Sequence, residues 1–133
     1  MTIEKKWIKE IVRTDEAPAA VGPYSQAVAA GPLIFVSGQL GLVPGTKTLA
    51  GDTIEEQTKQ AMENIAAILD AAGSSLDLVL KMAISLRDIK DFPGFNEVYG
   101  TFFEDDPPAR ATFEVSNLPL SALVEIEAIA LRD

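Results

Sequence analysis

The stretch from residue 53 to residue 86, TIEEQTKQAMENIAAILDAAGSSLDLVLKMAISL, predicts a helix followed by a strand. Thr53 and Glu56 have the spacing of a capping box, which opens a helix. Apolar residues then recur every three or four positions along one helical face, namely Ala61, Ile65, Ile68, Leu69 and Ala72. Gly73 stands where a glycine commonly ends a helix. From Leu80 to Leu86 apolar residues occupy alternate positions, the period of a half-buried strand.

The flanking sequence predicts four more strands and a second helix. We expect the strands at residues 8–12, 33–36, 110–115 and 124–131, from their apolar runs or alternation. Asp91 is a suitable N-cap for the second helix, and Pro107 and Pro108 would end it. Its core face would carry Phe95, Val98, Tyr99, Phe102 and Phe103. This order predicts a single α+β domain over residues 1–133, with two helices packed on one face of a mixed sheet.

The opposite face of that sheet is also predicted to be partly apolar. Ala83 and Ser85 are too small and too weakly polar for an ordinary wet surface, and Ile129 and Leu131 share the outer face of the last strand with two glutamates. An antiparallel sheet normally leaves one face to water. The pattern therefore predicts that subunits pack together through this face, as an oligomer.

The composition excludes several classes of function. The 133 residues include no Cys and no His, so disulfides, Ser-His-Asp triads and the usual zinc sites are excluded. Twenty acidic and eleven basic residues give a net charge of −9, which disfavours binding to nucleic acids or anionic membranes. No signal peptide and no membrane-spanning run is visible, so we expect a soluble cytoplasmic protein.

Arg110 is a candidate ligand-binding residue because it is the only cation between Lys90 and Arg132. Its guanidinium could receive a substrate carboxylate in two parallel hydrogen bonds. The alternative is an ion pair with one of the acidic residues just upstream, at positions 104–106.

Other polar residues allow similar pairs of interpretations. Glu125 and Glu127 share one strand face, where either could activate a water as a general base or simply remain solvated. Tyr24 follows a rigid Gly-Pro turn and could present its phenol to a pocket or pack in the core. Ser37 and Gly38 end a buried strand, where backbone amides could approach a ligand or merely form a turn.

The remaining candidates are weaker. Asn96 falls off the apolar stripe of the second helix, so it is either a ligand contact or an exposed residue. Gly38 and Gly41 match neither the dinucleotide nor the P-loop fingerprint, so nucleotide binding has no support.

Four motifs in order resemble the RidA family (YjgF/YER057c/UK114). They are APAAVGPYSQA at 17–27, VSGQ at 36–39, PAR at 108–110 and EIEAIA at 125–130, and the likeness runs from about Ala17 to Leu131. The resemblance implies a chorismate-mutase-like subunit, a homotrimer and pockets between neighbouring subunits. It also implies a 2-iminobutanoate/2-iminopropanoate deaminase, which hydrolyses reactive enamines and imines from pyridoxal-phosphate-dependent dehydratases to 2-oxo acids and ammonia, without a metal or cofactor.

The resemblance also assigns roles to residues. Arg110 matches the family arginine that clamps the substrate carboxylate, aided by the backbone amide of Gly38. Glu125 matches the glutamate that positions the attacking water and relays protons, whereas Glu127 looks structural. Tyr24, Ser37 and Asn96 match positions that line the pocket. Thr112 replaces the cysteine that many members carry two residues after the arginine, so its hydroxyl or carbonyl, rather than a thiol, would touch the water or the leaving nitrogen.

Relatives described as endoribonucleases or translation inhibitors, and others that are chaperone-like or non-catalytic ligand-binding modules, supply the alternative functions. RNA binding would have to use the only basic cluster, Lys5, Lys6, Lys9 and Arg13. A non-catalytic module would need Arg110 but not Glu125, and this chain has both. We therefore expect the deaminase.

Overall fold

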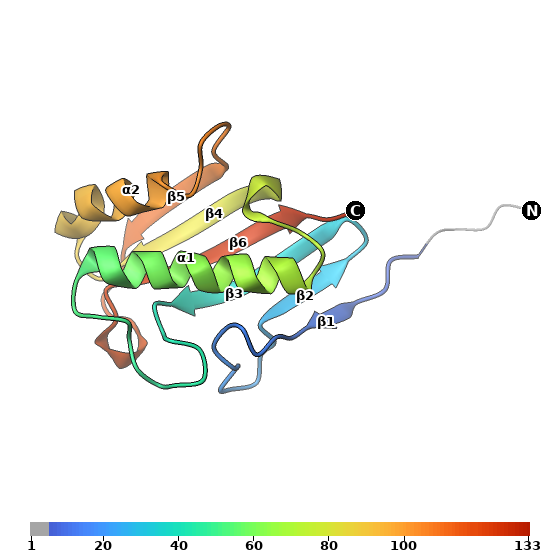
Figure 1. Cartoon of the computed structure of the whole chain (residues 1–133), viewed down its shortest axis with the longest axis horizontal. Helices are drawn as coiled ribbons and strands as arrows, with labels where there is room; N and C mark the ends of the chain where they lie inside the picture. Colours follow the sequence, from blue (N-terminus) through green and yellow to red (C-terminus); the bar gives the residue numbers. More distant parts are fainter. Residues whose placement is uncertain (1–5) are drawn as a thin grey trace, which may run out of the picture.

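A computed structural model describes residues 6–133 and consists of one mixed sheet with two helices on one face (Figure 1). The six strands stand in the order β1-β2-β3-β6-β4-β5. Their bounds are β1 Glu10–Val12, β2 Ala27–Ala30, β3 Leu33–Leu40, β4 Val79–Leu86, β5 Ala109–Glu114 and β6 Val124–Leu131, and the helices are α1 Ile54–Ala71 and α2 Phe92–Gly100. The predicted α+β arrangement is confirmed.

The last strand of the chain lies in the middle of the sheet. β6 pairs antiparallel with β3 on one side and with β4 on the other, so β3 and β4 run in the same direction. Helix α1 provides the long connection between those two strands, and α2 connects β4 to β5, the one parallel pair among the described strands. Such connections are typical of strands that run in the same direction and bury one face under helices.

Helix α1 begins and ends as its sequence predicts. Thr53 Oγ1 accepts a hydrogen bond from the Glu56 N–H at 3.1 Å and donates one to Glu56 Oε1 at 2.8 Å. Gly73 has a φ of +79°, and the Ser74 N–H donates to the Leu69 carbonyl at 2.8 Å, the pattern of a Schellman cap. The predicted apolar face is buried against β3 and β6 along its length.

Several details differ from the prediction, including the bounds of β1 and β3. The prediction missed β2, because its four small residues give almost no pattern, yet Ala27 and Ala29 are fully buried between β1 and β3. Leu80 was expected in the core but is 45% exposed, since a register shift at the start of β4 gives the buried position to Val79. Helix α2 ends at Gly100 rather than near Pro107, so Phe102 and Phe103 pack against the core from the loop beyond it. Asp91 is its N-cap residue, but the Asp91 side chain makes no capping hydrogen bond.

The sheet face opposite the helices carries exposed apolar side chains. Ile11, Val28, Phe35 and Ile129 lie opposite one another on β1, β2, β3 and β6 and form one cross-strand row. Phe35 is 48% exposed and Phe113, on β5, 61%. We call this surface the open face. Its apolar character agrees with the sequence prediction, while the assembly it was taken to indicate stays a prediction.

Candidate active site

Arg110 is held against helix α2 by one amide and three aromatic rings. It lies opposite Met82 on β5, on the side of the sheet that the helices cover. Its Nη1 donates a hydrogen bond to Asn96 Oδ1 at 2.8 Å. The guanidinium carbon lies 5.0 Å from the ring centroid of Tyr99, 5.4 Å from that of Phe92 and 5.7 Å from that of Phe95. These are cation–π distances, so the rings stabilise the charge without occupying the N–H groups.

No carboxylate pairs with this cation among residues 6–133. The ion pairs within 4 Å in that range are Lys59–Glu63 and Arg132–Glu10, so the upstream acids at positions 104–106 do not form the alternative salt bridge. Arg110 is exposed, and Asn96 uses one of its five N–H donors. The arrangement can therefore accept an external anion, and a planar carboxylate matches the fork of the guanidinium.

Two buried hydroxyls lie next to Arg110 without a hydrogen-bond partner in the described structure. Thr112 is two residues further along the same face of β5, and its Oγ1 is buried and unpaired. The hydroxyl of Tyr99, whose ring contacts the guanidinium, is also buried and unpaired. Burial raises the pKa of Tyr99, although the positive charge of Arg110 opposes this effect. Buried hydroxyls without a partner are costly, so a hydrogen-bonding group supplied from outside this subunit would stabilise both of them.

Glu125 lies on β6 and points to the open face. It lies opposite Ser85 on β4 and Leu40 on β3. Partial burial, and secondarily the negative charge of Glu127, raise the pKa of its carboxyl. Within the described residues no cation lies within 4 Å of this carboxylate and no hydrogen bond to it is formed. A carboxylate with a raised pKa and no fixed partner is chemically suited to accept a proton.

Ser37 and Gly38 form a bulge beside Glu125. The pairing of β3 with β6 runs from Val36–Ala128 to Gln39–Ile126, so these two residues oppose the single residue Glu127. Ser37 Oγ donates to the Ser25 carbonyl at 2.5 Å, and its N–H donates to the Gln26 carbonyl at 2.9 Å. Gly38 lies directly under the Glu125 carboxyl group. The bulge thus fixes the backbone of β3 against the preceding loop at the point where Glu125 stands.

Tyr24 belongs to that loop and is 49% exposed, so it is not a core tyrosine. Its Oη accepts a long hydrogen bond, 3.5 Å, from the Val21 N–H. The loop is anchored by Gln26, whose Nε2 donates to the Thr14 and Pro18 carbonyls at 3.0 and 2.8 Å and whose Oε1 accepts from the Thr14 N–H at 2.8 Å. Sequence reasoning gave Gln26 no role; a buried anchoring amide leaves no signal in a single sequence.

The candidate residues therefore form two groups, separated by the sheet. The first, which we call the arginine group, comprises Asn96, Arg110 and Thr112 beside α2. The second, the glutamate group, comprises Ser37, Gly38 and Glu125 on the open face, with Tyr24 in the adjoining loop. Strand register puts Arg110 on the face of Met82 and Glu125 on the face of Ser85, so one chain does not bring the two groups together.

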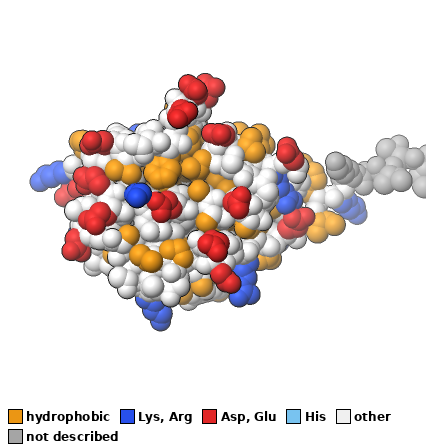
Figure 2. Space-filling model, in the orientation of Figure 1, with side chains coloured by type: hydrophobic (Ala, Val, Ile, Leu, Met, Phe, Trp, Pro, Cys, Tyr) orange, Lys and Arg blue, Asp and Glu red, His pale blue; other side chains and the backbone are white. Residues whose placement is uncertain are grey.

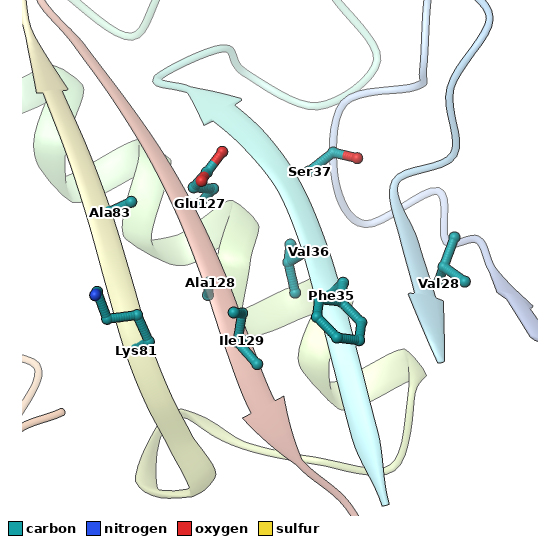
Figure 3. Close-up of a pocket in the computed structure, with 9 residues that line it drawn as sticks. All are labelled: Val28, Phe35, Val36, Ser37, Lys81, Ala83, Glu127, Ala128 and Ile129. Carbon is teal, nitrogen blue, oxygen red and sulfur yellow. The ribbon is translucent and has the colours of Figure 1, made fainter. Parts of the chain in front are cut away.

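The open face also contains a shallow groove of about 300 Å³ (Figure 3). Ser37, Lys81 and Glu127 supply its polar groups, and its apolar part comes from β2, β3, β4 and β6. Neither Arg110 nor Glu125 lines it. We do not regard this groove as the reaction site, because it lacks both candidate groups. No group of three acidic side chains within residues 6–133 could hold a metal ion, and the expectation of a metal-free site stays a prediction.

Comparisons with known proteins identify the family of this chain. The family model described as Endoribonuclease L-PSP matches residues 14–132. A RutC family protein of Saccharolobus solfataricus is 51% identical over 92% of this chain and 98% of its own length. The 2-iminobutanoate/2-iminopropanoate deaminase of Mus musculus is 45% identical over 94% of this chain and 93% of its own. The chain belongs to the RidA family.

Solved structures of similar proteins have the same fold, among them the crystal structure of RidA from an Antarctic Psychrobacter, which is 46% identical with a TM-score of 0.89 and covers 92% of this chain and 98% of that one. The crystal structure of E. coli TdcF with bound serine superposes with a TM-score of 0.89 at 39% identity, covering 93% of this chain and 99% of that one. The family model extends from residue 14 to residue 132 and therefore includes the segments that carry both groups of candidate residues. Among the described residues no helix is long and apolar enough to cross a membrane.

Proposed function

We propose that this chain hydrolyses 2-imino acids and their enamine tautomers, such as 2-iminobutanoate and 2-iminopropanoate, to 2-oxo acids and ammonia. Relatives bearing the deaminase name are 45% and 48% identical over more than nine-tenths of the chain, which marks it as a hydrolytic deaminase. The observation that carries the substrate class is the Arg110 guanidinium, held by Asn96 and three rings and not neutralised by any carboxylate of residues 6–133.

The arginine group supports recognition of a carboxylate. Two N–H groups of Arg110 would donate to the two oxygens of the substrate carboxylate, while Asn96 prevents the guanidinium from turning. The bound serine of TdcF is a molecule that also carries a carboxylate next to a nitrogen-bearing carbon. The Gly38 amide, Ser37 and Tyr24 would complete the lining from the glutamate group, and the unpaired Thr112 hydroxyl would contact the water or the leaving nitrogen.

Glu125 is proposed to move the protons. An enamine first gains a proton at carbon 3 and loses one from its nitrogen, which makes it the imine. Water then adds to carbon 2, with Glu125 accepting the proton that the water loses. Glu125 returns this proton to the nitrogen, which gives a carbinolamine. It then takes the proton of the new hydroxyl group and passes it to the amino group, so the carbon–nitrogen bond breaks and ammonia leaves as the carbonyl forms. One imine and one water thus give one 2-oxo acid and one ammonia. Positioning and base catalysis suffice because such imines already hydrolyse slowly in water.

A complete site needs a second copy of the chain, because the sheet separates the two groups within one subunit. We propose a homotrimer in which the arginine group of one subunit faces the glutamate group of the next. The apolar row on the open face supports this assembly, since such a surface favours burial against protein. We propose no metal or cofactor, a dehydratase as the source of the imine, and the cytoplasm as the location.

The direct test is an assay with freshly generated 2-aminoacrylate. The purified protein should accelerate the release of both ammonia and pyruvate, and RNA incubated with the same preparation should remain intact. Absence of any acceleration over the buffer rate contradicts the proposed function.

Mixing two impaired variants tests the division of the site between subunits. Arg110→Ala and Glu125→Gln subunits, unfolded together and refolded, should recover about a quarter of the parental activity, because random assembly leaves that share of interfaces with both groups intact. Each variant refolded alone is the control and should show only its own low residual activity at the same substrate concentration. If mixing recovers nothing while both variants form mixed trimers, the two groups act within one subunit.

Ribonuclease activity is the second candidate, because the matching family model bears that description. Net charge opposes it: the chain carries −9, and acidic side chains are spread over the helix-bearing face (Figure 2). In the basic cluster near the N-terminus, Lys6, Lys9 and Arg13 are exposed, and Lys5 lies outside the described residues. Tight RNA binding at moderate salt that is lost when these lysines are neutralised would reverse our ranking. Binding without turnover would instead indicate a non-catalytic module.

A further inference from the structure

Gly38 lies against the Glu125 carboxyl group, which occupies the space that a side chain at position 38 would need. A Cβ built at position 38 would lie 2.7 Å from Glu125 Cδ, 2.9 Å from Oε1 and 3.0 Å from Cγ. Its three nearest neighbours all belong to Glu125. Real Cβ atoms essentially never approach other atoms within 3.0 Å, so any residue other than glycine at this position must displace the carboxyl group.

Backbone conformation does not explain the glycine. Positive φ angles occur at Gly31, Gly45 and Gly73 but not at Gly38. Since the other allowed regions accept any L-residue, alanine could take the same backbone conformation. The bulge at Ser37–Gly38 brings the β3 backbone against β6, and Glu125 rests over the space that this leaves. Position 38 therefore requires glycine because a larger residue would occupy the space that the Glu125 side chain fills.

We propose that Gly38 is a positioning residue for Glu125: because Gly38 has no side chain, the Glu125 carboxyl group can pack directly against its Cα. The proposal deepens the proposed deaminase function and rests on it for its kinetic consequence. It differs from a role for the Gly38 amide, because the amide would act on the substrate, whereas the Cα acts through Glu125.

The contact with Gly38 should also affect the ionisation of the Glu125 carboxyl group. Packing against the backbone excludes water from one side of Glu125, and partial burial is the main cause of its raised pKa. Glu127, on the same strand, raises the pKa further. On β4 and directly after it, the charged residues are Lys81 and Arg87; neither pairs with Glu125, and Arg87 donates to the Ser121 carbonyl instead. β3 contributes no charged residue beside it. In the proposed trimer, Arg110 of the neighbouring subunit would face Glu125 and lower its pKa, in the parent and in Gly38→Ala alike.

Gly38→Ala isolates this effect. The new methyl group would meet the end of a flexible side chain rather than backbone, so the fold should persist while the carboxyl group moves toward solvent. A displacement of about 1 Å at a reacting group costs up to roughly 100-fold, so we expect kcat to fall by about 10- to 100-fold with little change in KM. The acid limb of the pH profile should move to lower pH, because a better hydrated carboxyl has a lower pKa.

Two controls make the result specific. Gly100→Ala adds a methyl group where nothing lies within 4 Å, and it should leave kcat and the pH profile unchanged. In a Glu125→Gln background, Gly38→Ala should cost no further activity, because there is no base left to misplace. An equal loss in both backgrounds, expressed mainly in KM, would show that the Gly38 amide matters instead and would overturn the proposal.

A measurement independent of activity separates this proposal from the proposed function. In protein labelled with ¹³C at glutamate carboxyl groups, titration should show a lower pKa for Glu125 in Gly38→Ala than in the parent. If Gly38→Ala changes neither the pKa of Glu125 nor kcat, the positioning role of Gly38 is contradicted, even if the parent protein is active in the deaminase assay. If Gly38→Ala fails to fold, adding Glu125→Ala should restore folding, since it removes the obstructing side chain. Failure of that double variant also overturns the proposal.

Discussion

The two charged residues at the candidate site are supported in opposite ways. Arg110 is surrounded by groups that stabilise its charge: an amide oxygen at 2.8 Å and three ring faces within 5.7 Å. Glu125 has none of these. It rests against a glycine, its nearest charged influence is the like charge of Glu127, and its pKa is raised. Within one subunit, fixed neighbours stabilise the cation before any ligand arrives, whereas the anion has no such neighbours.

This difference fits the two jobs we propose. A residue that binds must keep one charge and one orientation throughout the reaction, so permanent neighbours help it. A residue that accepts and returns a proton must not be held too firmly in either state, so permanent hydrogen bonds to its carboxylate would lower its basicity. The comparison makes three predictions, which differ in size and in the quantity that changes.

The largest effect is expected from Glu125→Gln. The amide keeps the shape of the side chain but cannot accept the proton of the attacking water, so kcat should fall by about 100-fold or more while KM changes little. Steady-state kinetics on 2-aminoacrylate measure both constants. Glu127→Gln is the matched control: its side chain is exposed and should affect kcat by less than about threefold. A Glu125→Gln enzyme with more than a tenth of parental kcat would place the base elsewhere.

Arg110→Ala should lower kcat/KM by about 30- to 150-fold, the equivalent of roughly 2–3 kcal/mol for a charge-assisted, two-pronged contact. The loss should appear mainly in KM. Arg110→Lys should recover only part of it, because an ammonium keeps the interaction with the rings but not the planar fork. Full activity of Arg110→Ala would contradict a carboxylate clamp, and light scattering should confirm that both variants assemble like the parent.

The smallest effect concerns stability and has opposite signs in the two groups. Within one subunit the folded-state pKa of Glu125 is raised, so its ionised form destabilises the folded subunit above that pKa, and the penalty fades as pH falls toward the ordinary glutamate value of 4.5. Glu125→Gln should therefore raise the Tm by about 1–3 °C at neutral pH, discounted for partial solvent exposure, and by nothing in acid. Arg110→Ala should lower the Tm, since it removes ring contacts and a hydrogen bond. Thermal melts over a pH series measure both, and a Glu125→Gln protein that melts below its parent would contradict the first.

The sequence predicts the parts of this molecule that depend on local patterns. The capping box at Thr53, the apolar face of α1 and the alternation of β6 each depend on residues within a few turns or positions, and the structure confirms them. The predictions for the end of α2 and for the burial of Leu80 were wrong, because these features depend on packing and on strand register, which a single chain segment does not encode. The four small residues of β2 become a strand only because neighbours on both sides pair with them.

The candidate site divides in the same way. Motifs identify Arg110 and Glu125, but their separation by the sheet follows from which strands pair, and no motif contains that information. The aromatic residues of α2 were predicted to form its core face; Phe95 and Tyr99 are indeed buried, and they also carry the arginine. The contact between Gly38 and Glu125 joins residues 87 positions apart, so only the folded chain shows why position 38 has no side chain.

The central place of β6 has a consequence for synthesis on the ribosome. Until the last strand has left the ribosome, β1, β2 and β3 cannot join β4 and β5, because β6 lies between the two halves. The edges of β3 and β4 then expose unpaired backbone groups, and such edges bind other strands readily. A nascent or truncated chain is therefore a substrate for chaperones and proteases, and Glu125 reaches its place only in the step that closes the sheet. The strand whose absence exposes these edges is thus also the strand that contains Glu125.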